Sequence, residues 1–274
     1  MNVNRLLFKT HLLFQSLGRG EFLTRCKMII EPKLEKIIRN RYPYNSQAKS
    51  FSELTAILYD IFTVKDVNPR LEEELVKVEA ELGPRLEALY LREDLPWSAR
   101  HNADPTLARL CYLLTRMLQP EIIVETGVAY GVTSFYLLSA LMKNGRGILY
   151  SIDLPPLCKN SEAYVGILVP SSLRTQWRLM IGPSERLLPQ VCAEVKCIDI
   201  FVHDSLHTYR HMMFEFSSVL SCLKGTYAVL ADDIEGHGAW FDFTKRLGPQ
   251  FQAVVKHSYK DGLCGIALSR SDKN

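Results

Sequence analysis

The sequence predicts an α/β protein with a doubly wound, mostly parallel β-sheet, and three observations support this prediction. From residue 122 onward, short apolar runs alternate with segments of helical periodicity, as in sheets whose strands are joined by crossover helices. The first run breaks at two glycines before a helix begins, a turn that often brings the backbone close to a nucleotide-like ligand. The last two runs are joined by a short Asp-Gly link, which predicts an antiparallel hairpin.

Along the chain, residues 1–100 predict a helical extension and residues 101–274 the sheet domain. Apolar residues recur at helical spacing within residues 50–63, 69–93 and 102–120. In the sheet domain we expect strands at 122–126, 147–153, 177–181, 197–204, 225–233, 251–259 and 262–270. We expect helices at 132–143, 184–195, 206–223 and 240–248.

The composition is that of an ordinary globular protein, with 47% hydrophobic and 23% charged residues. A net charge of +3 gives no argument for nucleic-acid binding. No stretch approaches the roughly 20 apolar residues that a membrane-spanning helix needs, and Lys9 and His11 interrupt the only N-terminal apolar run. The seven cysteines lack metal-ligand spacing and are predicted to be reduced, buried thiols in a cytoplasmic protein.

The charge is uneven, because residues 1–50 carry +7 and the remaining residues −4. This basic segment also holds apolar residues, so it could contact an acidic membrane surface peripherally. We favour the alternative that its apolar face packs on its own domain or on a second subunit, and we expect a homo-oligomer.

Polar residues gather at the predicted carboxyl ends of the strands. Because ligands of open parallel sheets bind outside that edge, these residues form the candidate site. In strand order they are Glu125, Gly127 and Gly131, then Asp153, Ser184, Asp204, His207, Asp232 and Asp233. Asp153 ends the second strand, where an acid can accept hydrogen bonds from both ribose hydroxyls of a nucleoside or can instead cap a turn.

The stretch "VETGVAYGVTS" resembles motif I of class I S-adenosylmethionine-dependent methyltransferases, which have a Rossmann-like sheet. Asp153 matches the ribose-binding acid of that family, and the terminal hairpin resembles its reversed last strand. By this resemblance Gly127 and Gly131 let the backbone approach the cofactor, and Glu125 binds its amino group. Thr133 and Ser134 either donate to its carboxylate or cap the helix. Ser184, after the third strand, completes the predicted cofactor-binding set.

Three carboxylates, from Asp204, Asp232 and Asp233, are expected at adjacent strand ends. Their mutual repulsion disfavours ionisation unless a cation lies among them, and oxygen ligands of this kind suit Mg²⁺ or a similar divalent cation. The spacing resembles the metal site of catechol O-methyltransferases. It is still more similar to that of macrocin-type sugar O-methyltransferases and the cephalosporin-hydroxylase-like group, which also place two adjacent acids there. Alternatively, one acid binds the cofactor or caps a helix and no metal is held.

The function implied is a Mg²⁺-dependent O-methyltransferase that acts on a hydroxyl of a small molecule, a sugar or other secondary metabolite. A metal lowers the pKa of such a hydroxyl, and a nearby base removes the proton. His207 is the candidate base, followed by His237 and His203, and Asp204 is the candidate catalytic metal ligand. The extension would cover the acceptor site or form an oligomer contact. The alternatives are an NAD-dependent oxidoreductase, which the Gly-Val-Ala-Tyr-Gly spacing and the hairpin disfavour, and a non-catalytic binding protein.

Overall fold

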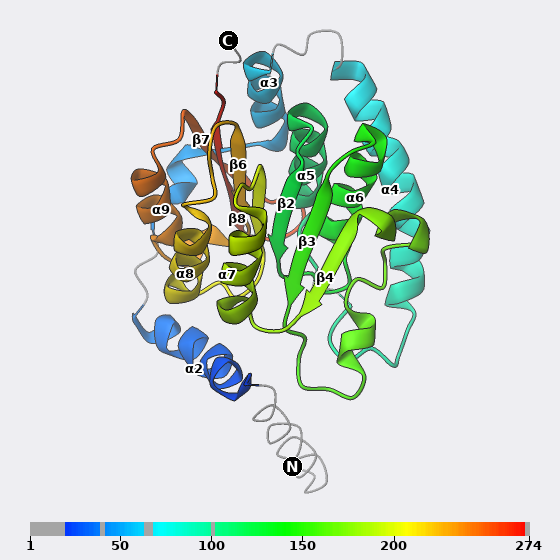
Figure 1. The fold of residues 1–274 in the computed structure, drawn as a ribbon, viewed down its shortest axis with the longest axis vertical. Coiled ribbons are helices and arrows are strands. Elements are labelled where there is room, and N and C mark those ends of the chain that lie inside the picture. Colours follow the sequence, from blue (N-terminus) through cyan, green and yellow to red (C-terminus); the bar gives the residue numbers. More distant parts are fainter. Residues whose placement is uncertain (1–19, 39–41, 63–67, 100–101, 272–274) are drawn as a thin grey trace, which may run out of the picture.

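The computed structural model describes residues 20–38, 42–62, 68–99 and 102–271. Its centre is an eight-stranded sheet in the order β1-β7-β8-β6-β5-β2-β3-β4, in which only β8 runs antiparallel to its neighbours (Figure 1). The predicted fold class, a doubly wound and mostly parallel sheet with a reversed last strand, is therefore confirmed. The strands are β1 (Ala48–Lys49), β2 (Ile122–Thr126), β3 (Ile148–Asp153), β4 (Trp177–Ile181), β5 (Ile200–His203), β6 (Tyr227–Ala231), β7 (Phe251–Lys256) and β8 (Leu263–Ser269).

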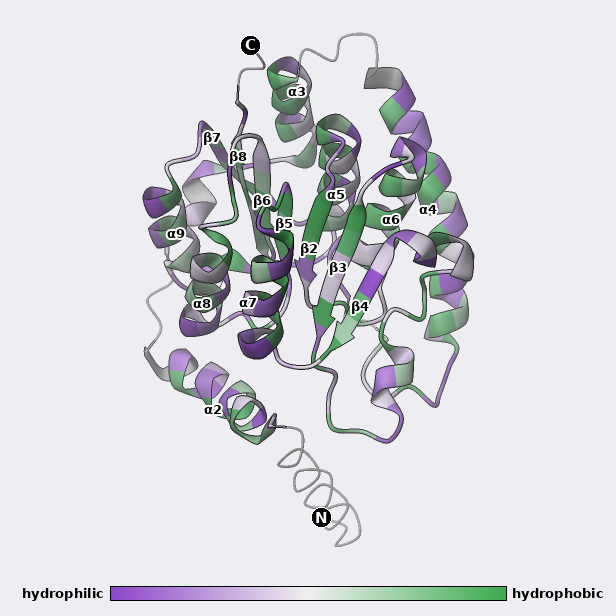
Figure 2. Cartoon of the chain, in the orientation of Figure 1, coloured by the Kyte–Doolittle hydropathy of each residue, from purple (hydrophilic) through white to green (hydrophobic). Residues whose placement is uncertain are grey.

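Helices cover both faces of the sheet. Side chains of successive strand residues point to opposite faces, so Ile123 joins one apolar layer and Val124 the other. The first layer packs against α3 (Phe51–Ile61), α4 (Asn68–Tyr90), α5 (Pro105–Leu118) and α6 (Val132–Asn144). The second packs against α7 (Ser184–Val195), α8 (Tyr209–Val219) and α9 (Ala239–Leu247). Figure 2 shows the central strands as largely hydrophobic, which agrees with their burial between two helical layers.

The helix α2 (Phe22–Ile38) lies apart from these layers, beneath the carboxyl ends of the central strands (Figure 1). Arg25 fastens it to the loop after β3 by donating to the carbonyl of Pro155 at 2.8 Å. Glu35 fastens it to the start of α8 by accepting from the backbone N–H of Tyr209 at 2.7 Å, where a helix N-terminus favours an acid. No described helix is long and apolar enough to cross a membrane.

The prediction was wrong about the last connection. The antiparallel pair is present, but β7 already ends at Lys256 and β8 begins at Leu263, so residues 257–262 form a loop rather than a short Asp-Gly link. The reason is a long-range contact, because the buried carboxylate of Asp104 accepts from the backbone N–H groups of Ser258 (3.1 Å) and Tyr259 (3.0 Å). Strand β1, which extends the sheet by pairing with β7, was also missed because it has only two residues.

Candidate active site

The turn between β2 and α6 is shaped by two glycines with positive φ. At Gly127 (φ +83°) a Cβ atom would overlap the backbone carbonyl of Asp204, so only glycine lets these two strand ends approach each other. At Gly131 (φ +95°) a Cβ atom would lie 2.8 Å from Cα of Gly166, in the loop that precedes β4. Both glycines are therefore required by backbone packing, and Gly127 also lines a cavity.

Asp153, at the end of β3, holds this turn in place. One oxygen of its carboxylate, Oδ2, accepts hydrogen bonds from the backbone N–H groups of Val128 (2.7 Å) and Ala129 (2.8 Å). Backbone donors of this kind fix the orientation of the carboxylate. Asp153 also lines the cavity, so the turn-capping position of the acid is compatible with ribose binding.

A cavity of about 220 Å³ opens at the carboxyl edge of the sheet. Its walls include three groups of residues predicted from the sequence: the turn with Gly127, the acid Asp153 with Ser184, and the first acid of the other cluster, Asp204. The helix α2 contributes Thr24 and Met28 to the same cavity. Part of the N-terminal extension therefore covers the candidate site.

Four predicted cofactor-binding residues do not line this cavity: Glu125, Gly131, Thr133 and Ser134. Glu125 is fully buried, and its Oε2 accepts from the hydroxyls of Ser134 (2.6 Å) and Ser151 (2.7 Å). Burial raises the pKa of Glu125 to about 8. Its Oε1 and the hydroxyl of Thr133 are buried without a hydrogen-bond partner. Ser134 thus faces Glu125, and the assignment of these residues to the cofactor stays a prediction.

The predicted acids lie together with His207. The ring of His207 bridges two of them, with Nε2 3.6 Å from Asp204 and Nδ1 3.6 Å from Asp233. Burial and the charge of Asp232 raise the pKa of Asp204 to about 7. Burial by itself would lower the pKa of His207, but contact with Asp204 and the charge of Asp233 raise it to about 9. Among the three candidate bases, His207 is the one that touches the acid cluster.

The other two histidines are held by different partners. His203 is fully buried, and its Nδ1 lies 2.6 Å from the carboxylate of Glu215, while burial lowers its pKa. His237 accepts from the backbone N–H of Ala239 at 3.3 Å and lies 3.9 Å from Glu35 of α2. Both positions suit a structural role better than the removal of a substrate proton.

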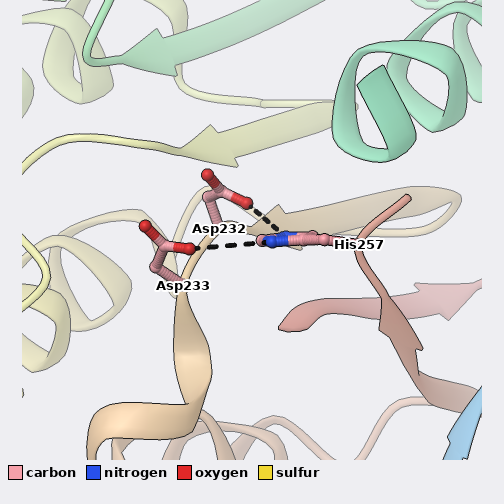
Figure 3. A group of neighbouring side chains, drawn as sticks. All are labelled: Asp232, Asp233 and His257. Carbon is pink, nitrogen blue, oxygen red and sulfur yellow. Dashed lines mark ion pairs between the residues drawn. The ribbon is translucent and has the colours of Figure 1, made fainter. Parts of the chain in front are cut away.

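Two residues of the acid cluster were missed by sequence reasoning. His257 places Nε2 2.8 Å from Asp232 Oδ1 and Nδ1 3.8 Å from Asp233 Oδ1 (Figure 3). Lys260 places its Nζ 3.0 Å from Asp232 Oδ2 and 2.8 Å from Asp233 Oδ1. The strand order contained the information needed to find both residues, because β7 runs parallel to β6 and therefore ends at the same edge of the sheet as Asp232. The predicted strand was too long: it ran to residue 259, so His257 was assigned to the strand and not to the loop that follows it.

The spacing of the side chains in the acid cluster is suitable for a divalent cation. Asp232, Asp233 and His257 each offer a ligand atom within 4.8 Å of the others, and mixed carboxylate and imidazole sets bind divalent metals. Asp232 Oδ1 and both ring nitrogens of His257 are buried without a hydrogen-bond partner, despite the 2.8 Å approach of Nε2. Asp204 lies outside this set of three and contacts the cluster through His207.

A second buried carboxylate contacts the end of β5, the strand next to β6. Glu215 of α8 is fully buried and accepts from four side chains. Its Oε2 accepts from His203 and Thr126 (both 2.6 Å), and its Oε1 accepts from His211 (2.9 Å) and Ser205 (3.0 Å). Burial opposes ionisation, yet the charges of His203 and His211 hold the pKa of Glu215 well below its usual range. This network supports the cavity wall, since Ser205 and His211 line it.

Comparisons with known proteins agree with this geometry. Residues 124–234 match a family model described as "Methyltransferase domain". No curated protein sequence matches the chain. The matched segment contains the glycine turn, Asp153 and all three acids.

Solved structures resemble the fold. An O-methyltransferase from Bacillus cereus in complex with SAH is 14% identical, with a TM-score of 0.50 over 71% of this chain and 91% of that one. A cofactor-bound protein from MTB is also 14% identical, with a TM-score of 0.52 over 82% of this chain and 100% of that one. A putative O-methyltransferase from Klebsiella pneumoniae is 13% identical, with a TM-score of 0.51 over 84% and 100%. At these identities the likeness establishes the methyltransferase fold.

Proposed function

We propose that this methyltransferase domain transfers a methyl group from S-adenosylmethionine to a hydroxyl of a small molecule, a sugar or other secondary metabolite, with the help of a divalent cation such as Mg²⁺. The observation that carries the proposal is the shared cavity. The glycine turn and Asp153, which match the cofactor motif, line the same cavity as Asp204, which begins the acid cluster. A donor held by the turn would therefore lie beside Asp204, which connects the cavity to the other acids through His207.

The residues of the turn have defined roles in this proposal. Gly127 and Ala129 leave the backbone open toward the cavity, and Asp153 holds the turn while facing the cofactor ribose. Ser184 lines the same cavity, with its hydroxyl 3.2 Å from His211 Nε2. Methyl transfer is a displacement at a sulfonium carbon, so the main task of these groups is to hold donor and acceptor close and in line.

Asp232, Asp233 and His257 would hold the divalent cation, and Asp204 would lie next to it. When bound, the cation supplies Lewis acidity that lowers the pKa of the acceptor hydroxyl. His207, whose ring lies between Asp204 and Asp233, would be the base once the positive charge of a bound cation offsets the two acids that raise its pKa to about 9 and so leaves the imidazole neutral. The two acids orient the imidazole and stabilise the imidazolium that forms when it takes the hydroxyl proton.

The helix α2 would cover the bound acceptor. Its inner side lines the cavity with Thr24 and Met28, whereas Leu23 (73% exposed), Ile30 (52%) and Leu34 (51%) face outward. We propose that this outer face packs on a second copy in a cytoplasmic homo-oligomer. Light scattering after gel filtration tests this, and a monomer at micromolar concentration would contradict it.

Calorimetric titration tests the catalytic proposal directly. We expect binding heat with S-adenosylmethionine and none with NAD, and methyl transfer to a hydroxylated acceptor that EDTA suppresses and Mg²⁺ restores. Asp204→Ala should lower turnover about a thousandfold, because electrostatic assistance worth several kcal/mol is lost, while cofactor affinity changes little. No heat with S-adenosylmethionine would reject the function. Turnover that survives EDTA unchanged would reject only the metal.

A further inference from the structure

Lys260 already supplies a positive charge to the carboxylates that would bind the metal. Its Nζ lies 3.0 Å from Asp232 Oδ2 and 2.8 Å from Asp233 Oδ1, so one ammonium contacts both acids at once. Asp233 Oδ1 is also the atom that faces His257. The ammonium and a divalent cation would therefore use the same oxygen.

This position of Lys260 is built into the loop between β7 and β8. Asp104, which caps α5 through the backbone N–H of Thr106 (2.9 Å), also accepts from the backbone of Ser258 and Tyr259. At the other end, the backbone N–H of Leu263 donates to Glu235 at 3.1 Å. The loop is thus fastened on both sides of Lys260 to elements of the sheet domain.

Gly262 allows this loop to close onto the acids. A Cβ atom there would lie 2.5 Å from His257 Nδ1 and 3.1 Å from Asp233 Oδ1. The backbone of the loop therefore packs directly against two candidate metal ligands. The long side chain of Lys260 can still turn away, since it is 36% exposed whereas that of His257 is fully buried.

We propose that the Lys260 ammonium is the resident cation of this site and that it competes with a divalent metal for Asp232 and Asp233. The inference rests on the metal part of the proposed function. Without metal, Lys260 compensates the two adjacent acids; when a metal binds, the Lys260 side chain turns out toward solvent. Two cations on one carboxylate oxygen repel each other at these distances, so each state excludes the other.

Competition of this kind raises the apparent Kd for the metal: it equals the intrinsic Kd divided by the fraction of molecules in which Lys260 has left the two acids. If the ammonium is in place in about nine of ten molecules, metal affinity is reduced about tenfold. Removing the charge of Lys260 should restore the intrinsic affinity, provided that the fold is kept. Retaining a positive charge at this position should not.

The test is Mn²⁺ binding to the full chain, followed by electron paramagnetic resonance, for the wild type and for Lys260→Met, Lys260→Gln and Lys260→Arg. We expect Lys260→Met to bind Mn²⁺ about tenfold more tightly than the wild type and Lys260→Arg to bind like the wild type. Lys256→Met, which removes an exposed lysine from the same hairpin, is the matched control and should change nothing. Lys260→Gln also removes the positive charge but keeps a hydrogen-bond donor. It should bind Mn²⁺ more tightly than the wild type as well, and it replaces the methionine variant if that variant does not fold.

A second readout is thermal unfolding. In EDTA, Lys260→Met should melt below the wild type because Asp232 and Asp233 lose their counter-ion, and Mn²⁺ should raise its melting temperature more than that of the wild type. Equal or weaker Mn²⁺ binding by both Lys260→Met and Lys260→Gln would overturn the inference while leaving the proposed metal site intact. No Mn²⁺ binding by any variant would overturn both, and S-adenosylmethionine titration would then report on the cofactor part alone.

Discussion

Glu215 and Asp232 are both buried carboxylates that contact histidines, but their surroundings differ. Glu215 lies on α8 and contacts His203 at the end of β5, whereas Asp232 follows the neighbouring strand β6. Glu215 accepts hydrogen bonds from four side chains, and both of its oxygen atoms have partners. Asp232 accepts from Lys260 through Oδ2, while Oδ1 has no hydrogen-bond partner among the described residues although His257 lies 2.8 Å away.

This difference separates a structural network from a binding site. A buried charge is tolerated when its lone pairs are filled by the protein, and a filled network fixes the positions of the groups around it. The groups that contact Asp232 are a histidine, which can itself ligate a metal, and a partly exposed lysine, so we propose that this acid binds a ligand. The Glu215 network therefore supports the cavity wall, whereas the Asp232 cluster is the site that we propose for the divalent cation.

The largest effect on stability is expected from Glu215→Gln, which tests whether the Glu215 network is structural. The amide nitrogen is a donor and would face side chains that themselves donate to Glu215, and His211, whose pKa is raised, would lose its counter-ion. We expect the free energy of unfolding to fall by about 3–5 kcal/mol in urea denaturation, as for other broken buried ion pairs. Glu194→Gln, which changes an exposed acid that accepts from Tyr150, is the control and should shift stability by less than about 0.5 kcal/mol. A loss below about 1 kcal/mol for Glu215→Gln would show that the network is dispensable.

The corresponding change at the other acid, Asp232→Asn, should act mainly on turnover. The amide keeps the shape but removes a charged ligand, so we expect a loss of about a hundredfold or more in kcat. The free energy of unfolding should change by less than for Glu215→Gln, because Lys260 keeps Asp233 as a partner at 2.8 Å and its side chain is partly exposed to water. Steady-state kinetics and urea denaturation of the same preparation measure both quantities. A variant that unfolds as readily as Glu215→Gln would contradict the distinction between the two carboxylates.

Gly262→Ala probes the close packing of the loop on His257. The added methyl group would lie 2.5 Å from His257 Nδ1 and 3.1 Å from Asp233 Oδ1, so the distance between these two candidate ligands must change. We expect about tenfold weaker Mn²⁺ binding, comparable to the loss of a group that orients a metal ligand. Gly236→Ala is the matched control, because no described atom lies within 4 Å of a Cβ built at that position. Equal effects of both changes would mean that the position of His257 is unimportant for the metal.

The smallest expected effect is a pH dependence of stability in the metal-free protein. The pKa of His207 is raised from 6.5 to about 9 in the folded state, so its protonation stabilises the fold fully below pH 6.5. That contribution is lost as the pH rises through about 9. In EDTA, the melting temperature of the wild type should fall over this window, and that of His207→Gln should fall less. Parallel curves for the two proteins would show that His207 is not charged by its acidic neighbours.

Much of the fold and part of the site could be predicted from local pattern. Strands that are buried on both faces are apolar throughout, so β2, β5 and β6 are readily recognised in the sequence. Residues that follow parallel strands must share one edge, so the order of strands along the chain was enough to bring Asp204 and Asp232 together. The sequence pattern did not reveal that Glu215 is buried, although His211 four residues earlier is its partner on the same helix.

The sequence by itself determined the sheet, the turn at Gly127 and the row of acids, because these depend on short-range periodicity and on the direction of parallel strands. Tertiary structure alone decided three further features: the loop drawn away from β7 by Asp104, the contacts of His257 and Lys260 with the acids, and the position of α2 over the cavity. Each of these depends on contacts between residues far apart in the chain. No local pattern encodes such contacts, because the loop and the helix take their positions from partners that only the folded chain supplies.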